Sequence, residues 1–126
     1  MTIDPRALAL DYLECVRVLD TDGMLARFAD GAKVWLPGQG WIAPAQLAAL
    51  LGGARGLLVD GIRFTHEDTL SDGNRAVVMT TCDSPLHNGK SYVNQFCFVF
   101  TFDGAGKITQ MREYTDSAPA VAAFHS

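Results

Sequence analysis

The stretch from Ser91 to Asp116 constrains the fold most strongly, because it has the pattern of one long β-hairpin. Successive side chains on a strand point to opposite faces, so even- and odd-numbered residues separate. The even-numbered face of 92–102 carries four phenylalanines, and the odd-numbered face carries Val93, Cys97 and Val99. Both faces are therefore apolar near the middle of the strand. We expect helices of the same chain to cover one face and a second subunit to cover the other.

The turn of this hairpin predicts how its strands pair. Gly104 to Gly106 suits a three-residue loop, which places Asp103 opposite Lys107. Uninterrupted pairing from there puts three further pairs on one face: Phe98 with Arg112, Phe96 with Tyr114, and Asn94 with Asp116. A carboxylate and a carboxamide would then lie side by side at the end of an aromatic surface. A register shift of one residue would move Asp116 to the opposite face.

Composition limits the classes of function. A chain of 126 residues forms one domain with a single core, expected here over residues 1–126. The net charge is -4 and the basic residues are not clustered, which argues against nucleic acid as a partner. The sequence has no phosphate-binding glycine motif, and we expect no cofactor and no metal. Three cysteines in apolar segments indicate reduced thiols in the cytoplasm. We expect no signal peptide and no membrane segment.

The order of elements indicates an α+β fold. Helices are expected at 5–20, 23–28 and 44–51, where Asp4, Asp22 and Pro44 provide start signals. Strands are expected at 34–36, about 62–69 and 75–82, followed by the hairpin. Helices that precede a run of strands in one compact unit are typical of α+β architecture.

This order resembles the NTF2-like superfamily of α+β cones. The hairpin sequence YVNQFCFVFTFDGAGKITQMREYTD is similar to the closing hairpin of the SnoaL-like and ketosteroid-isomerase-like branch, with its FVF strand, DGKI turn and EYxD ending. The turn here, DGAGKI, is two residues longer. The segment FAD…VWLPG…GW matches more weakly. The resemblance implies N-terminal helices on a curved, mixed but mainly antiparallel sheet that encloses a pocket. It also implies a homodimer formed through the convex sheet face.

Four residues are candidates for catalysis. By its place in the EYxD ending, Asp116 resembles the acid/base aspartate of SnoaL-like cyclases; the alternative is that it caps the C-terminal tail. Asn94 could stabilise an oxyanion or orient Asp116, or be a plain cross-strand partner. His66 could be a second acid or base, or a half-buried structural residue. Tyr12 lies in the first helix, as the donor tyrosine of ketosteroid isomerases does.

Seven further residues are expected to line the pocket, although core packing would also explain the aromatic ones: Trp35, Trp41, Phe64, Phe96, Phe98, Arg112 and Tyr114. Arg112 could hold an acidic substrate or keep Asp116 ionised. Tyr114 could equally be a packing residue whose hydroxyl finds a partner.

Three functions fit these expectations. The first is a cofactor-independent enzyme that performs acid/base isomerisation, cyclisation or a related lyase or hydrolase step on an apolar ring compound with a carbonyl group. The second is a module that binds a small hydrophobic molecule without converting it. The third is an interaction domain that dimerises through its sheet. The fold alone does not choose among them.

Overall fold

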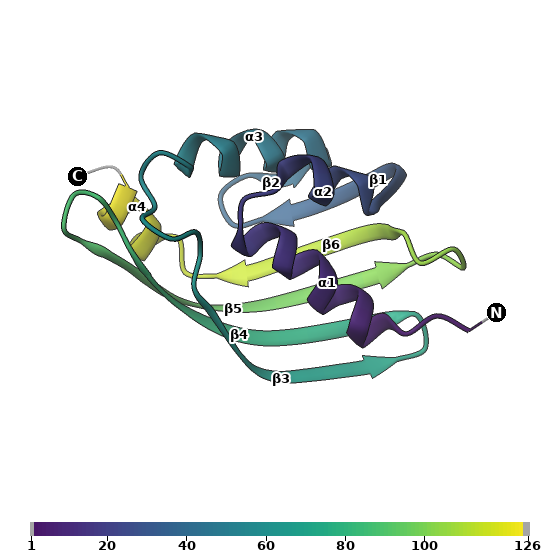
Figure 1. Ribbon diagram of the computed structural model, residues 1–126. Coiled ribbons are helices and arrows are strands. Elements are labelled where there is room, and N and C mark those ends of the chain that lie inside the picture. Colours follow the sequence, from purple (N-terminus) through teal and green to yellow (C-terminus); the bar gives the residue numbers. More distant parts are fainter. Residues whose placement is uncertain (1, 125–126) are drawn as a thin grey trace.

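The computed structural model describes residues 2–124 and contains four helices and six strands (Figure 1). None of the helices within these residues is long and apolar enough to cross a membrane. In chain order the elements are α1 (Pro5–Arg17), α2 (Thr21–Ala26), β1 (Phe28–Leu36), β2 (Gly40–Ile42), α3 (Pro44–Ala54), β3 (Phe64–Asp72), β4 (Arg75–Pro85), β5 (Ser91–Phe102), β6 (Ile108–Thr115) and α4 (Ala118–Phe124).

All six strands form one curved sheet in the order β2-β1-β6-β5-β4-β3. Only the pairing of β1 with β6 is parallel, and every other neighbouring pair is antiparallel. Helices α1, α2 and α3 lie over the same side of the sheet, and α4 lies near the start of β5 (Figure 1). The predicted α+β cone, with a mixed and mainly antiparallel sheet, is confirmed.

The first two helices begin at side-chain caps. The Asp4 carboxylate accepts a hydrogen bond from the Ala7 amide at 3.3 Å, and Pro5 follows directly, as the sequence predicts. Helix α1 ends at Arg17, earlier than expected, because Leu19 adopts a left-handed backbone with φ of 58°. Asp20 then caps α2 by accepting from the Gly23 amide at 2.9 Å. The expected cap, Asp22, lies inside the helix.

Two element boundaries differ from expectation. Strand β1 starts at Phe28, where a helix end was expected, and it continues through a glycine with positive φ at Gly31. Phe28 pairs with Ile108 of β6, so this pairing with a distant strand extends β1. Helix α3 continues through Gly52 and Gly53 to Ala54, although these glycines were expected to end it. Local propensity is a weak guide where tertiary contacts favour another structure.

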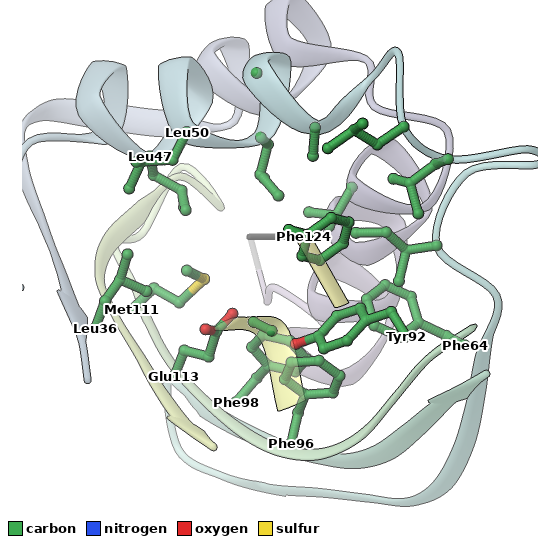
Figure 2. Close-up of a pocket in the computed structure, with 18 of the residues that line it drawn as sticks. Leu36, Leu47, Leu50, Phe64, Tyr92, Phe96, Phe98, Met111, Glu113 and Phe124 are labelled. Carbon is green, nitrogen blue, oxygen red and sulfur yellow. The ribbon is translucent and has the colours of Figure 1, made fainter. Parts of the chain in front are cut away.

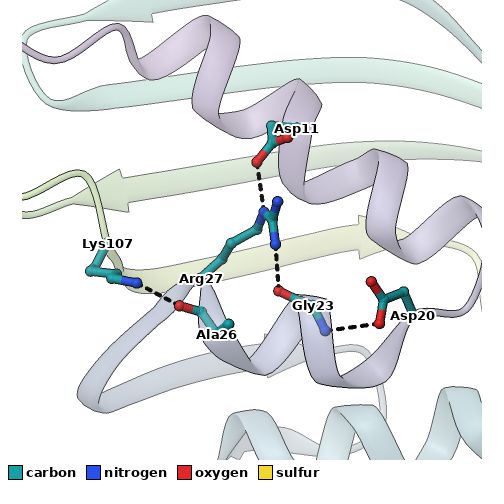
Figure 3. A network of polar contacts seen from close by, with 6 residues as sticks. All are labelled: Asp11, Asp20, Gly23, Ala26, Arg27 and Lys107. Carbon is teal, nitrogen blue, oxygen red and sulfur yellow. Dashed lines mark hydrogen bonds and ion pairs between the residues drawn. The ribbon is translucent and has the colours of Figure 1, made fainter.

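Arg27 joins the first two helices on the outside of the cone (Figure 3). Its Nε pairs with the Asp11 carboxylate of α1 at 2.6 Å, and its Nη1 donates to the Gly23 carbonyl of α2 at 2.8 Å. Lys107, in the turn between β5 and β6, donates to the Ala26 carbonyl at 2.6 Å. These contacts fix α2 between α1 and the hairpin turn, so the helical cover and the hairpin keep a defined relation.

The hairpin turn forms as predicted, but the register beyond it differs by one residue. The Asp103 amide donates to the Lys107 carbonyl at 2.9 Å, and Phe102 pairs with Ile108. Thr109 is then an extra residue, because the next pair is Thr101 with Gln110. A bulge of this kind shifts every later pair by one position. The predicted pairing of Phe98 with Arg112 is therefore wrong beyond the turn.

Candidate functional site

The concave side of the sheet and the helices α1, α3 and α4 enclose a cavity of about 430 Å³ (Figure 2). A volume of this size is typical of sites for small organic ligands. The walls are almost wholly aliphatic and aromatic: Val16, Leu36, Leu47, Leu50, Leu51, Leu57, Leu58, Ile62, Phe64, Phe96, Phe98, Met111 and Phe124. Gly53, Ala54 and Ala120 also line it, and three side chains bring polar groups: Tyr12, Tyr92 and Glu113.

Glu113 brings a carboxyl group into this apolar cavity. It lies on β6 directly opposite Phe98, and its carboxyl points into the open space in Figure 2. Within residues 2–124 it has neither an ion-pair partner nor a hydrogen-bond donor. Burial alone raises the pKa of Glu113 from 4.5 to about 7, because the apolar walls disfavour the charged form. The carboxyl group is therefore poised to gain or lose a proton near neutral pH.

Tyr92 places a hydroxyl group in the same cavity, from the start of β5. Its oxygen accepts a hydrogen bond from Nδ2 of Asn94 at 2.9 Å. Burial raises the pKa of Tyr92 to about 12, with the Asn94 hydrogen bond opposing this shift and the Glu113 charge adding to it. The hydroxyl therefore stays protonated at neutral pH. Asn94 itself is buried and does not line the cavity.

Tyr12 contributes a second hydroxyl from α1. The side chain is 1% exposed, and its ring packs edge-on against Phe28 and Phe100. Among the described residues its hydroxyl has no hydrogen-bond partner. Burial and the nearby Glu113 charge raise the Tyr12 pKa far above its usual range. An unpartnered buried hydroxyl costs roughly 1–3 kcal/mol, so it is suited to a polar group of a ligand.

Three of the aromatic residues expected in the pocket line the cavity, namely Phe64, Phe96 and Phe98. The rings of Phe96 and Phe98 are stacked with an interplanar angle of 11° and centroids 5.3 Å apart. Phe64 meets both of them edge-on, at 5.8 and 6.1 Å. These rings form a rigid floor, because each holds the others in a preferred aromatic geometry.

Asp116 lies outside the cavity, which corrects its expected position beside Asn94. The side chain is exposed, and its Oδ1 accepts a hydrogen bond from the Ala118 amide at 3.0 Å, at the start of α4. Asn94 meets only the main chain of Asp116, donating to its carbonyl at 2.8 Å. The carboxylate thus caps the C-terminal helix, which was the alternative that the sequence left open.

Four residues expected in the pocket lie instead on the outer face of the sheet. We call Trp35, Trp41, Arg112 and Tyr114 the outer aromatic cluster. The rings of Trp35 and Tyr114 are 5.3 Å apart, and the Arg112 guanidinium lies 4.9 Å from the Trp41 ring centroid. Arg112 also donates to the Tyr114 hydroxyl at 3.3 Å. The Thr109 bulge turns Arg112 and Tyr114 outward. Trp35 faces outward because it alternates with the buried Val34 and Leu36 of β1, and Trp41 is its partner on β2.

His66 also lies away from the cavity. Its ring stacks on Phe64 at 5.7 Å, and its Nδ1 is 3.0 Å from the Thr80 hydroxyl. Partial burial lowers the His66 pKa, and the Glu14 charge opposes this shift. The residue is exposed and does not line the cavity, so a direct role in it would require movement of β3.

Over residues 2–124, no three His, Cys, Asp or Glu side chains are grouped closely enough to hold a metal ion. The cavity offers one carboxylate and two phenolic hydroxyls as polar groups. What these groups can do is exchange a proton and donate hydrogen bonds.

Glu113 is not among the site residues expected from the sequence, although the sequence of β6 indicates that it lies on the inner face. Ile108 and Met111 are both 1% exposed, although they are three residues apart. A regular strand places residues at odd separation on opposite faces, so both can be buried on one face only if a bulge lies between them. Met111 and Glu113 then share the inner face. The two apolar residues could have indicated the shifted register.

The cone and the apolar cavity beneath its helices define a class of α+β proteins, and sequence comparison makes the assignment more specific. The profile of the SnoaL-like domain family matches residues 9–111. The chain therefore belongs to the SnoaL-like family within the NTF2-like superfamily. No curated protein sequence shows significant similarity to the chain.

Solved structures share the fold at low sequence identity. An NTF2-like protein of unknown function from Burkholderia pseudomallei is 19% identical, with a TM-score of 0.78 over 98% of this chain and 100% of that one. TerC, co-crystallised with polyporic acid, is 21% identical, with a TM-score of 0.76 over 98% and 100%. An LEH-like epoxide hydrolase from M. tuberculosis is 21% identical, with a TM-score of 0.75 over 94% and 87%. At this level of identity the similarity establishes the fold alone.

Proposed function

We propose that the protein is a cofactor-independent enzyme in which Glu113 performs acid/base chemistry on a small apolar molecule with a carbonyl group. The observation that carries this proposal is the position of Glu113 as an unpaired carboxyl in an apolar cavity, with its pKa raised to about 7. Keeping such a group uncompensated lowers stability, and active sites are where shifts of this kind concentrate. We therefore assign to Glu113 the acid/base role that the sequence predicted for Asp116.

The chemistry follows from the carboxyl group. As a carboxylate, Glu113 takes a proton from the carbon next to the carbonyl. The C–H electron pair forms the C=C bond of an enolate, and the carbonyl π pair moves onto the oxygen. Return of that proton to the same or another carbon completes an exchange or an isomerisation. Attack of the enolate carbon on a second carbonyl of the same molecule closes a ring, and the resulting alkoxide takes the proton that Glu113 holds. The apolar walls exclude water from the reacting atoms.

Two of the solved structures with this fold are compatible with such a cavity, but they do not determine the reaction of this chain. The epoxide hydrolase and TerC, which was co-crystallised with polyporic acid, share the cone with this chain. The alternative function is a binding module that holds the same kind of ligand without conversion. It is favoured by the almost wholly apolar walls, which would bind a hydrophobic molecule whether or not Glu113 reacts.

Hydrogen–deuterium exchange into a small ketone distinguishes these functions without knowledge of the natural substrate. The probe is 2-tetralone, a two-ring ketone with acidic protons next to its carbonyl, incubated with the protein in D2O and followed by proton NMR. We expect the wild type to accelerate exchange and Glu113→Gln to lose at least about 100-fold of that acceleration, a usual size for a catalytic acid/base. The control is Asp116→Asn, which leaves the cavity unchanged and should exchange as the wild type does.

Each result has a defined meaning. Exchange that depends on Glu113 supports the enzyme. Saturable binding of 2-tetralone without exchange supports the binding module. Exchange that persists in Glu113→Gln contradicts the assignment of the acid/base residue.

The outer aromatic cluster supports a homodimer formed through the convex face of the sheet. Trp41 is 45% exposed and Tyr114 is 43% exposed, and the same sheet carries the exposed apolar side chains Val93 on β5 and Leu70 on β3. Exposed aromatic residues together with an arginine are typical of a protein interface. A second copy of the chain would cover it, as the two-sided apolarity of β5 predicts.

Sedimentation measurements test the dimer. Trp41→Lys should shift the protein toward monomer, while Val18→Lys, an exposed apolar position on the helical side, should not. A wild type that stays monomeric at all concentrations contradicts the dimer.

The free cysteines Cys15 and Cys82 are buried, which supports the cytoplasm as the location of the protein.

A further inference from the structure

Asn94 holds the Tyr92 hydroxyl with a fixed direction of hydrogen bonding. Its Nδ2 donates both to the Tyr92 oxygen at 2.9 Å and to the Asp116 carbonyl at 2.8 Å. Its Oδ1 accepts from the Gln95 amide at 2.9 Å. An amide rotated by 180° would set its oxygen against the Asp116 carbonyl and its NH2 against the Gln95 N–H. Both contacts would be repulsive, so the main chain determines which end of Asn94 faces Tyr92.

The direction at Asn94 determines what the Tyr92 hydroxyl can do. A hydroxyl that accepts from an amide keeps its own proton for another acceptor. Within residues 2–124 the Tyr92 hydroxyl donates no hydrogen bond, and it points into the cavity (Figure 2). The cavity walls are apolar apart from Tyr12 and Glu113, and neither of these is hydrogen-bonded to Tyr92. Among the described residues, the proton of Tyr92 therefore has no acceptor, and an oxygen atom of a bound molecule could take that place.

The ring of Tyr92 is also held in place. It packs against Phe124 of α4, with centroids 5.1 Å apart, and edge-on against Phe96 at 6.4 Å. The side chain is 8% exposed. Fixed at both the ring and the hydroxyl, Tyr92 is a preorganised donor, and such donors lose little entropy when a ligand binds.

We infer that Tyr92 is a ligand-contacting residue that donates a hydrogen bond to the oxygen of the bound molecule, and that Asn94 is the positioning residue that directs this donor. The inference rests on the proposed function, since it needs the cavity to take an oxygen-bearing apolar molecule. The ligand oxygen would lie near Tyr92, with the carbon that exchanges its proton facing Glu113. In the enolate the same hydrogen bond would meet a negatively charged oxygen and become stronger.

The test compares two probes that differ only in the oxygen, 2-tetralone and the hydrocarbon tetralin, by their dissociation constants. We expect the wild type to prefer 2-tetralone, because tetralin leaves the Tyr92 proton without an acceptor. Tyr92→Phe keeps the ring packing and should lose roughly tenfold of this preference, the effect of one hydrogen bond. Tyr114→Phe is the matched control, because it removes a hydroxyl from the outer face.

A double-mutant cycle separates positioning by Asn94 from a general structural effect. Asn94→Ala should lower the preference for 2-tetralone in the wild-type background and have no further effect on it in Tyr92→Phe. An equal loss in both backgrounds would overturn the positioning role. Should Asn94→Ala fail to fold, Asn94→Ser provides the same comparison with a smaller cavity.

The outcomes also separate this inference from the proposed function. If Tyr92→Phe keeps the full preference for 2-tetralone while exchange still depends on Glu113, the proposed function stands and the role of Tyr92 is overturned. If the wild type binds neither probe, the proposed function fails and the inference fails with it.

Discussion

Glu113 on β6 lies directly opposite Phe98 on β5, and this pairing turns its carboxyl into the cavity. The pairing exists because Thr109 is an extra residue in β6, where its hydroxyl donates to the Thr101 carbonyl at 3.2 Å. Without that bulge Arg112 would face inward and Glu113 outward. One inserted residue in a strand thus determines which ionisable group the cavity receives.

Glu113 should make the wild type less stable as the pH rises from about 4.5 to about 7, when compared with Glu113→Gln. Its pKa is about 7 in the folded protein and 4.5 as the ordinary value, so over this interval the folded state keeps a proton that the unfolded state releases. The wild type therefore loses free energy of unfolding relative to Glu113→Gln as the pH rises through this interval. The loss is about 1.4 kcal/mol per pH unit and roughly 3 kcal/mol in total.

Urea denaturation of both proteins between pH 4 and pH 8 measures this difference. The subtraction removes the contributions of the other titrating groups, which both proteins share. Parallel curves for wild type and Glu113→Gln would show that the carboxyl group is solvated and has an ordinary pKa.

Tyr12→Phe should stabilise the ligand-free protein by about 1 kcal/mol. The Tyr12 hydroxyl is buried and has no partner among residues 2–124, and removal of an unsatisfied polar group relieves its desolvation cost. Tyr92→Phe is the matched comparison and should lower stability, because it leaves the Nδ2 of Asn94 without one acceptor. Thermal denaturation measures both changes. A fall in stability for Tyr12→Phe would indicate that its hydroxyl is satisfied in solution.

Asp116→Ala should lower stability by roughly 0.5–2 kcal/mol, the usual effect of losing a side-chain helix cap. The carboxylate oxygen accepts the Ala118 amide at the start of α4. Asp116→Asn keeps an oxygen at that position and should change stability much less. Neither substitution should alter the pH dependence that Glu113 causes. A loss of exchange activity larger than the loss of folded protein would instead show that Asp116 takes part in the reaction.

Gly61→Ala should destabilise the protein by about 2–4 kcal/mol. A Cβ at this position would lie 2.1 Å from the Arg17 carbonyl oxygen, and its φ of +60° disfavours a side chain. The Gly61 segment would have to move away from the end of α1, where the Ile62 amide donates to the same carbonyl. Gly56→Ala is the control, since nothing lies within 4 Å of its Cβ. Equal denaturation midpoints for the two variants would contradict the close approach.

The fold could be predicted from the sequence because its signals are local and repeated. The alternation of 92–102, the Asp103 turn and the Asp4 cap each indicated one element, and each of those elements formed. Strand β1 was mostly missed, because Phe28 joins the sheet only through parallel pairing with β6, about 80 residues later. Such long-range pairing has no local pattern.

The site was harder to predict than the fold, because a one-residue shift exchanges the two faces of a strand. Phe96 and Phe98 needed only the alternation of β5 and were placed on the inner face. Arg112, Tyr114 and Asp116 needed the register of β6 as well, and the bulge displaced all three. A register error leaves the architecture intact and changes the chemistry of the cavity.

The most direct test of this account is the pKa of Glu113, measured by carbon NMR of the side-chain carboxyl groups in protein labelled at glutamate. The chain has only three glutamates, and Glu113→Gln assigns the resonance by removing it. We expect this resonance to titrate with a pKa of about 7. A pKa close to 4.5, like that of an exposed glutamate, would contradict an acid/base residue that the apolar cavity shields from water.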